Sequence, residues 1–196
     1  MVIRFEYAPN ATPLDPDESV GLLARHITTQ AELNEWEQAN ILEGQRWAVK
    51  QGRRDMLDEA FVRELHHRMF SKTWKWAGQF RHTDKNIGVD WQQVPVQLCN
   101  LLGDAKTQIE FKSYPTDELV LRFHHRLVWI HPFANGNGRH ARLMADLLIA
   151  RLGQPAFNWG GQALVSAGEK RRAYLEALRA ANVRDYQLLL KFARGR

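Results

Sequence analysis

The sequence predicts an all-α fold with one short β-hairpin. Apolar residues recur at helical spacing through most of the chain, and capping signals precede several of these segments. Strand-like alternation is confined to residues 86–94, which we expect to form the hairpin. With 196 residues, of which 44% are hydrophobic and 25% charged, the chain can bury the core of a single globular domain.

The first elements follow from local composition. Residues 1–20 are rich in Pro, Asp, Asn and Thr, which predicts an extended arm or lid. Thr29 and Glu32 form a capping box before a helix that reaches about Val49. A second helix is expected over residues 61–70, because apolar side chains recur there every three or four positions.

Two further helices lead to the centre of the chain. Pro95 suits the first turn of a third helix, whose apolar stripe runs from Leu98 to Ile109. Thr116 begins a fourth helix, which must end before Pro132 because proline breaks the helical hydrogen bonding.

The remaining elements complete the helical fold. A fifth helix follows the turn after Pro132 and stops near Gly153. Ser166 and Glu169 form a second capping box, and Asp185 is expected to begin the last helix. The chain has no apolar run of membrane-spanning length and no signal-like N-terminus, so we expect a cytoplasmic protein that does not enter a membrane.

Composition argues against two other classes of function. The net charge of +5 is spread along the chain, so its basic clusters are expected to be solvated helix ends and not a nucleic-acid surface. A lone cysteine, Cys99, excludes a disulfide framework and is expected to be buried on a helix. The pairs His66-His67 and His124-His125 are assigned to structure and surface, since adjacent helical residues diverge by about 100° and do not share a ligand-bearing face.

The strongest functional signal is a histidine followed by a glycine-rich turn and two arginines: His131, Gly136, Asn137, Gly138, Arg139 and Arg142. Small residues let backbone N–H groups surround a phosphate, and the positive end of a following helix faces the same anion. Arg139 and Arg142 lie three positions apart and can both hold phosphate oxygens. His131 can take a proton from an attacking hydroxyl. The segment therefore indicates a nucleoside polyphosphate site.

Structural interpretations of the same residues remain open. A Gly-Asn-Gly run suits the positive φ angles of a tight turn between helices, whatever it binds. His131 could be a core histidine, and the two arginines could be surface charges. Phe133 is expected in the core, where it would anchor the turn.

The segment resembles the signature of the Fic/Doc family, His-x-Phe-x-(Asp/Glu)-Gly-Asn-Gly-Arg-x-x-Arg, and departs from it at Asn135. Residues 131–146 resemble in particular the subgroup called mobile mystery protein B, and residues 74–81 resemble the family's segment before its flap. The resemblance covers about residues 55–160. It implies a Fic-type helical bundle with a short β-hairpin flap over the active site.

The resemblance also implies an activity. It identifies a bacterial, toxin-like protein adenylyltransferase that transfers AMP from ATP to a Ser, Thr or Tyr hydroxyl of a target protein, with His131 as general base. The ATP-binding residues would be Gly136, Asn137, Gly138, Arg139 and Arg142, the last at the γ-phosphate. Asn135 would hold Mg²⁺ weakly, because an amide replaces the family's carboxylate. The target would add a strand to the flap residues Ile87, Gly88 and Val89.

Glu43 is the candidate regulatory residue. It lies on an apolar helix face, where a carboxylate needs a cation, and an ordinary salt bridge would satisfy it. Residues 39–44 also resemble the family's inhibitory motif, (Ser/Thr)-x-x-x-Glu-(Gly/Asn), with Ala39 in place of the hydroxyl residue. That resemblance implies that Glu43 pairs with Arg142 and denies it to the γ-phosphate.

These expectations divide the domain into an arm (1–28), an inhibitory helix (29–54), a Fic core (55–160) and C-terminal helices packed on the core (161–196). A non-catalytic Fic-fold module that binds a nucleotide or a partner is the alternative, because Asn135 replaces the metal-binding carboxylate. A basic nucleic-acid-binding protein is a weaker third reading, because no recognition-helix motif supports it.

Overall fold

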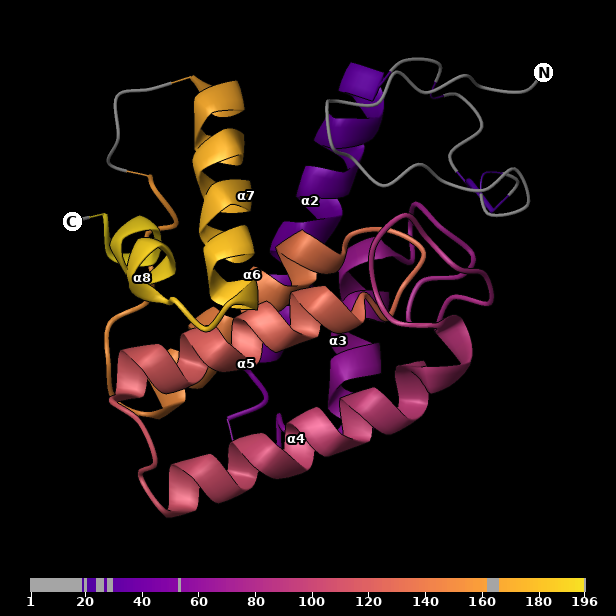
Figure 1. Ribbon diagram of the computed structural model, residues 1–196. Coiled ribbons are helices and arrows are strands. Elements are labelled where there is room, and N and C mark those ends of the chain that lie inside the picture. Colours follow the sequence, from indigo (N-terminus) through magenta and orange to yellow (C-terminus); the bar gives the residue numbers. More distant parts are fainter. Residues whose placement is uncertain are drawn as a thin grey trace.

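The computed structural model describes residues 19, 21–23, 27, 30–52, 54–161 and 166–195, and confirms an all-α fold (Figure 1). In chain order the elements are α2 (Gln30–Val49), α3 (Glu59–Phe70), the 3₁₀-helix η1 (Trp91–Gln93), α4 (Val94–Glu110), α5 (Thr116–Ile130), α6 (Asn137–Arg151), α7 (Ala167–Asn182) and α8 (Gln187–Arg194). Within these ranges the only β contact is an isolated antiparallel bridge between Leu22 and Trp74.

The helices pack around one hydrophobic core. α5 packs against α6 and α4, α2 packs against α3, and α7 packs against α8. In Figure 1, α4 and α5 run side by side across the lower half, while α2 and α7 rise from the centre toward the same side. Among the described helices, none combines the length and the apolar character needed to cross a membrane.

Local signals placed most helix ends correctly. Ser166 and Glu169 form the predicted capping box, and Pro95 lies in the first turn of α4. Gly153 follows the end of α6 with a φ of +77°. The last helix begins two residues after the predicted Asp185, whose carboxylate accepts a hydrogen bond from the backbone N–H of Gln187 at 3.0 Å. Thr29 and most of the predicted arm lie outside the described residues.

The predicted hairpin over residues 86–94 is wrong. This segment is a bent loop that leads into η1 and α4. Asp84 and Asp90 accept hydrogen bonds from the backbone N–H groups of Trp91 and Gln92, at 2.9 and 2.8 Å, and so start η1 instead of a strand. The carbonyl of Val89 in this loop accepts a hydrogen bond from the side chain of Arg81 and not from a neighbouring strand.

The buried face of α2 agrees only in part with the predicted one, which placed Glu43 with Leu33, Trp36, Asn40 and Trp47. Its buried positions are Leu33, Glu37, Asn40, Gly44 and Ala48, while Glu43 is exposed. Gly44 explains the rotation of the helix, because a Cβ at this position would lie 2.7 Å from a side-chain carbon of Met69 on α3. The two helices therefore approach at the glycine.

One smaller expectation also failed. Cys99, predicted to be buried, is exposed on α4. The buried stripe of that helix passes instead through Leu98, Leu101, Leu102 and Ala105.

Candidate active site

The predicted anion turn joins α5 to α6 and is bounded by two residues in the left-handed region. His131 ends α5 with a φ of 54°, and Gly136 precedes α6 with a φ of 77°. A non-glycine residue in this region carries strain, and such strain often marks a functional site. Gly136 has a second constraint, because a Cβ there would lie 2.6 Å from the ring of Phe70.

The turn is closed by its own side chains. Asn137 accepts a hydrogen bond from the backbone N–H of Phe133 at 2.9 Å and donates one to the carbonyl of the same residue at 2.7 Å. Phe133 is buried in the core, as predicted. Asn137 therefore shapes the turn through its side chain and can offer an anion only its backbone N–H.

The start of α6 leaves backbone donors for an anion. The first N–H to bond back along the chain is that of His140, which donates to the carbonyl of Gly136 at 2.9 Å. The N–H groups of Asn137, Gly138 and Arg139 precede it in the first turn, where helical N–H groups have no partner within the helix. Together with the helix dipole, these donors are suited to an anion, so the anion site stays a prediction that this geometry permits.

His66 on α3 holds the turn through a hydrogen bond to its backbone. Its Nδ1 accepts a hydrogen bond from the backbone N–H of Gly78 at 2.9 Å, so its Nε2 carries the proton and donates to the carbonyl of Asn135 at 3.0 Å. The ring is fully buried and stacks on Phe133 with centroids 3.7 Å apart. This histidine is structural as predicted, but it belongs to the core and not to the surface.

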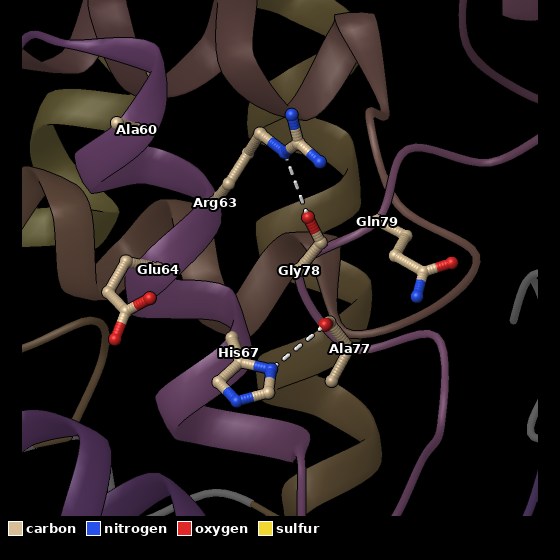
Figure 2. Close-up of a pocket in the computed structure, with 7 residues that line it drawn as sticks. All are labelled: Ala60, Arg63, Glu64, His67, Ala77, Gly78 and Gln79. Carbon is tan, nitrogen blue, oxygen red and sulfur yellow. Dashed lines mark hydrogen bonds between the residues drawn. The ribbon is translucent and has the colours of Figure 1, made fainter.

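A pocket of about 420 Å³ lies between α3 and residues 77–79 (Figure 2). It is lined by Ala60, Arg63, Glu64, His67, Ala77, Gly78 and Gln79. Figure 2 shows that Arg63 donates to the carbonyl of Gly78 and that His67 Nδ1 meets the carbonyl of Ala77, at 3.0 and 3.1 Å. These contacts hold the 77–79 segment against α3, and the pocket contains none of the predicted site residues.

Arg81 connects His131 to the loop predicted as the flap. Its side chain is completely buried and donates to the carbonyls of His131 at 2.7 Å, Thr83 at 2.8 Å and Val89. Its own backbone N–H donates to the carbonyl of Pro132 at 3.0 Å. The loop lies against the histidine, because a Cβ on Gly88 would lie 2.8 Å from the Cβ of His131.

His131 is neutral at physiological pH. Burial and, to a smaller extent, the positive charge of Arg81 lower its pKa to about 4, although a hydrogen bond to the carbonyl of Val128 acts in the opposite direction. A neutral imidazole can accept a proton, and a bound polyphosphate would raise this pKa by stabilising the imidazolium. The environment therefore suits a general base that works beside anions.

We expect acid to destabilise the fold through its buried histidines. Burial lowers the pKa of His124 to about 3 and of His131 and His140 to about 4, and that of His66 falls well below its usual value. The unfolded chain therefore binds more protons as pH falls below 6.5, at a cost of about 2 kcal/mol per histidine by pH 5. Asp146, whose pKa burial raises to about 6, opposes this by about 1 kcal/mol. Urea unfolding at pH 7 and pH 5 measures the loss, and equal stabilities would contradict it.

The two arginines have different environments. Arg139 donates to the carboxylate of Glu37 at 2.6 Å, and the same carboxylate accepts a hydrogen bond from Trp74 Nε1 at 2.7 Å. Arg142 makes no hydrogen bond or ion pair with the described residues, and its guanidinium carbon lies 5.2 Å from the ring centroid of Tyr174. Arg139 is therefore neutralised by a carboxylate, whereas Arg142 has no such partner among the described residues.

The predicted contact between Glu43 and Arg142 is wrong. Glu43 is exposed and pairs with Lys72, with an N–O distance of 2.6 Å. The glutamate that reaches the anion turn is Glu37, which is 4% exposed. Glu37 was not among the predicted residues, although it shares a helix face with Leu33, Asn40, Gly44 and Ala48.

Asn135 provides a poor site for Mg²⁺. Its side-chain oxygen accepts a hydrogen bond from the backbone N–H of Gly136 at 2.5 Å, so the amide oxygen is already engaged. Mg²⁺ favours anionic oxygen ligands and is usually held by one or two carboxylates together with the phosphates of a nucleotide, whereas Asn135 offers a neutral amide oxygen. Within the described residues no group of three or more acidic, histidine or cysteine side chains could hold a metal by itself. The donor set of this turn consists of backbone N–H groups and arginines, which fit an anion.

The sequence of this chain matches known proteins of one family. The sequence model of the Fic/DOC family matches residues 56–149. The protein adenylyltransferase Fic of Culex quinquefasciatus is 29% identical over 120 residues, and the protein adenylyltransferase fic-1 of Caenorhabditis elegans is 29% identical over 119 residues. Each alignment covers 59% of this chain but only 22% of the relative, so the chain spans about a fifth of the length of these curated relatives.

Solved structures confirm the fold. Fic-1 of C. elegans superposes with a TM-score of 0.61 at 24% identity, covering 81% of this chain and 48% of that one. BepC of Bartonella tribocorum, solved with bound AMPPNP, gives a TM-score of 0.66 at 19% identity and covers 88% of this chain and 89% of that one. The N-terminal Fic domain of a Bartonella quintana protein with bound ADP gives 0.67 at 17% identity, with 86% of each chain covered. The likeness to the mobile mystery protein B subgroup stays a prediction.

Proposed function

Because this chain belongs to the Fic/DOC family, we propose that it is a protein adenylyltransferase, which transfers AMP from ATP to a hydroxyl group of a target protein. The observation that carries the proposal is the neutral, buried His131 at one end of the turn that leads into α6, the helix that carries Arg142. Arg142 has no hydrogen-bond or ion-pair partner among the described residues. Relatives named protein adenylyltransferase, and neighbours of the same fold solved with AMPPNP and ADP, support a nucleotide at this turn.

The proposed chemistry is a single displacement. The target's Ser, Thr or Tyr oxygen attacks the α-phosphorus of ATP, and His131 takes the hydroxyl proton. The bond between the α-phosphorus and the bridging oxygen breaks, and pyrophosphate leaves. The N–H groups of Gly138 and its neighbours, with Arg139 and Arg142, hold the phosphates and neutralise the charge on the leaving group.

In this proposal the resting protein is inhibited by α2. The carboxylate of Glu37 binds Arg139 at 2.6 Å and is itself held by Trp74, so ATP must displace a partly buried ion pair to use both arginines. Arg139 also lies over the ring of Phe70, with 5.0 Å between the guanidinium carbon and the ring centroid, which fixes its position for this contact. Release of α2 would free Arg139 for the phosphates.

The proposed docking site for the target is the loop formed by Ile87, Gly88 and Val89. Ile87 is 47% exposed, and Gly88 lies directly against His131. A target segment that binds along this loop would present its hydroxyl to the imidazole. Arg81 fixes the loop relative to the histidine through the carbonyls of Val89 and His131.

We expect Asn135→Asp to increase the dependence of transfer on Mg²⁺. The added carboxylate supplies the anionic ligand that Mg²⁺ prefers, at the position where the family's signature has one. Transfer rates titrated with Mg²⁺ in both proteins measure the effect. An unchanged titration with an equal or lower rate would show that this turn works without a metal at residue 135.

Radiolabel in the α-phosphate of ATP tests the proposed function. Transfer of label to the protein itself or to a protein in a cell lysate is the expected result, and it should be lost in His131→Ala. Label in the γ-phosphate should not be transferred, which separates adenylylation from phosphorylation.

The alternative is a Fic-fold module that binds nucleotide without transferring it. Asn135 favours this function, because a neutral amide oxygen that already accepts a hydrogen bond replaces the carboxylate of the family's signature. Tight AMPPNP binding combined with no label transfer, even after Glu37 is replaced, would establish it.

A further inference from the structure

The environment of Arg142 extends beyond the segment that matches the family. Tyr174 lies on α7, outside residues 56–149, and is 8% exposed. Its ring centroid is 5.2 Å from the guanidinium carbon of Arg142. A cation this close to an aromatic face is attracted by the negative charge of the ring.

Tyr174 is itself held in place from two sides. Its hydroxyl oxygen is 3.0 Å from Nε2 of His124 on α5, and its ring lies 5.5 Å from that of Phe192 on α8. Burial raises the pKa of Tyr174 to about 12, so the ring faces Arg142 as a neutral phenol. The ring of Tyr174 is therefore held in one position by its neighbours.

Asp146, the acidic residue nearest to Arg142 on α6, accepts a hydrogen bond from a second aromatic residue, Trp159. Asp146 lies one helical turn after Arg142, at a spacing where opposite charges can pair. Both of its carboxylate oxygens instead lie 3.0 Å from Nε1 of Trp159, and one also accepts the backbone N–H of Phe157 at 3.2 Å. Arg142 thus keeps its donors unpaired among the described residues.

We propose that Tyr174 is a positioning residue that holds Arg142 for the terminal phosphate of ATP, while Trp159 keeps Asp146 from neutralising it. The inference rests on the proposed function, because it takes Arg142 as the γ-phosphate ligand. It makes the segment after residue 149 part of the nucleotide site. Recognition of ATP over ADP would then depend on α7.

Affinities for AMPPNP and ADP test this, measured by calorimetry on the full chain with Mg²⁺ present. Tyr174→Leu removes the ring and should weaken AMPPNP binding about 3- to 30-fold while leaving ADP binding within about 2-fold. Tyr174→Phe keeps the ring, loses the bond to His124, and should bind both nucleotides within about 2-fold of wild type. Equal loss of both nucleotides in Tyr174→Leu would mean a merely structural residue and would overturn the inference.

Arg142→Ala separates this inference from the proposed function. If Arg142→Ala loses AMPPNP selectively and Tyr174→Leu does not, the positioning role fails and the γ-phosphate role stands. If Arg142→Ala binds AMPPNP like wild type, the proposed role of Arg142 fails, and the inference fails with it.

Trp159→Phe provides a test that does not depend on the folding of Tyr174→Leu. It removes the indole donor, so Asp146 should turn toward Arg142 and lower AMPPNP affinity with little effect on ADP. Adding Asp146→Asn should restore the affinity, because the competing charge is gone. Unchanged AMPPNP affinity in Trp159→Phe would contradict the role of Trp159.

Discussion

Replacing His131 with alanine is expected to reduce AMP transfer by about 10²- to 10⁴-fold, the contribution typical of a single general base. The neutral imidazole of His131 is the proposed base, and Arg81 donates to the backbone carbonyl of this residue at 2.7 Å. AMPPNP binding should change little, because the proposed phosphate ligands are the first turn of α6 and its arginines and not His131. Transfer rates with α-labelled ATP, together with calorimetric affinities, separate the two effects.

A matched histidine controls for general damage. His82 is exposed and lies outside the anion turn, so His82→Ala should transfer at the wild-type rate. Far-ultraviolet circular dichroism checks that His131→Ala keeps its helices despite the loss of a buried ring. A transfer rate in His131→Ala equal to that of wild type would remove this histidine from the mechanism.

Replacing Glu37 with glutamine is expected to activate the protein. The pair with Arg139 is a charge-assisted hydrogen bond of 2.6 Å from a carboxylate that is 4% exposed. Such bonds contribute about 1.5–3 kcal/mol, so their loss should raise ATP affinity, and transfer at low ATP, by about 10- to 150-fold. Glutamine keeps an oxygen for the indole of Trp74, so α2 should stay in place.

Glu43→Gln is the matched control, since it removes a carboxylate from the exposed face of the same helix. Glu43 pairs with Lys72 where both side chains are more than half exposed, so this variant should behave like wild type. Activation by Glu43→Gln but not by Glu37→Gln would contradict the inhibitory role of Glu37. Autolabelling of the three proteins, compared at the same ATP concentration, decides between them.

The sequence alone determined the helices and the turn, because their signals are local. The Ser166–Glu169 capping box, Pro95 and Gly153 act within a few residues, and the structure places all three as predicted. The anion turn could be recognised for the same reason. Its glycines, its asparagine and the helix that follows are contiguous, and Asn137 closes the turn with bonds to a residue only four positions away.

The tertiary structure determined which distant side chains contact this turn. Glu37 and Arg139 are 102 residues apart, and they meet because Gly44 lets α2 approach α3 with its polar positions turned inward. Periodicity favoured Glu43 instead, since it placed the tryptophans of α2 on the buried face. Trp36, however, is 39% exposed, and Trp47 is only partly buried against the core.

The loop before α4 depended on tertiary contacts in the same way. Alternating side chains favoured a hairpin, but a strand also needs a partner for its backbone groups. Arg81, completely buried, supplies the donors for the carbonyls of Thr83 and Val89 and binds the carbonyl of His131 as well. Sequence spacing determined which groups could form the site. Close packing and the need to satisfy buried polar atoms determined which of them meet, since both depend on residues distant in the chain.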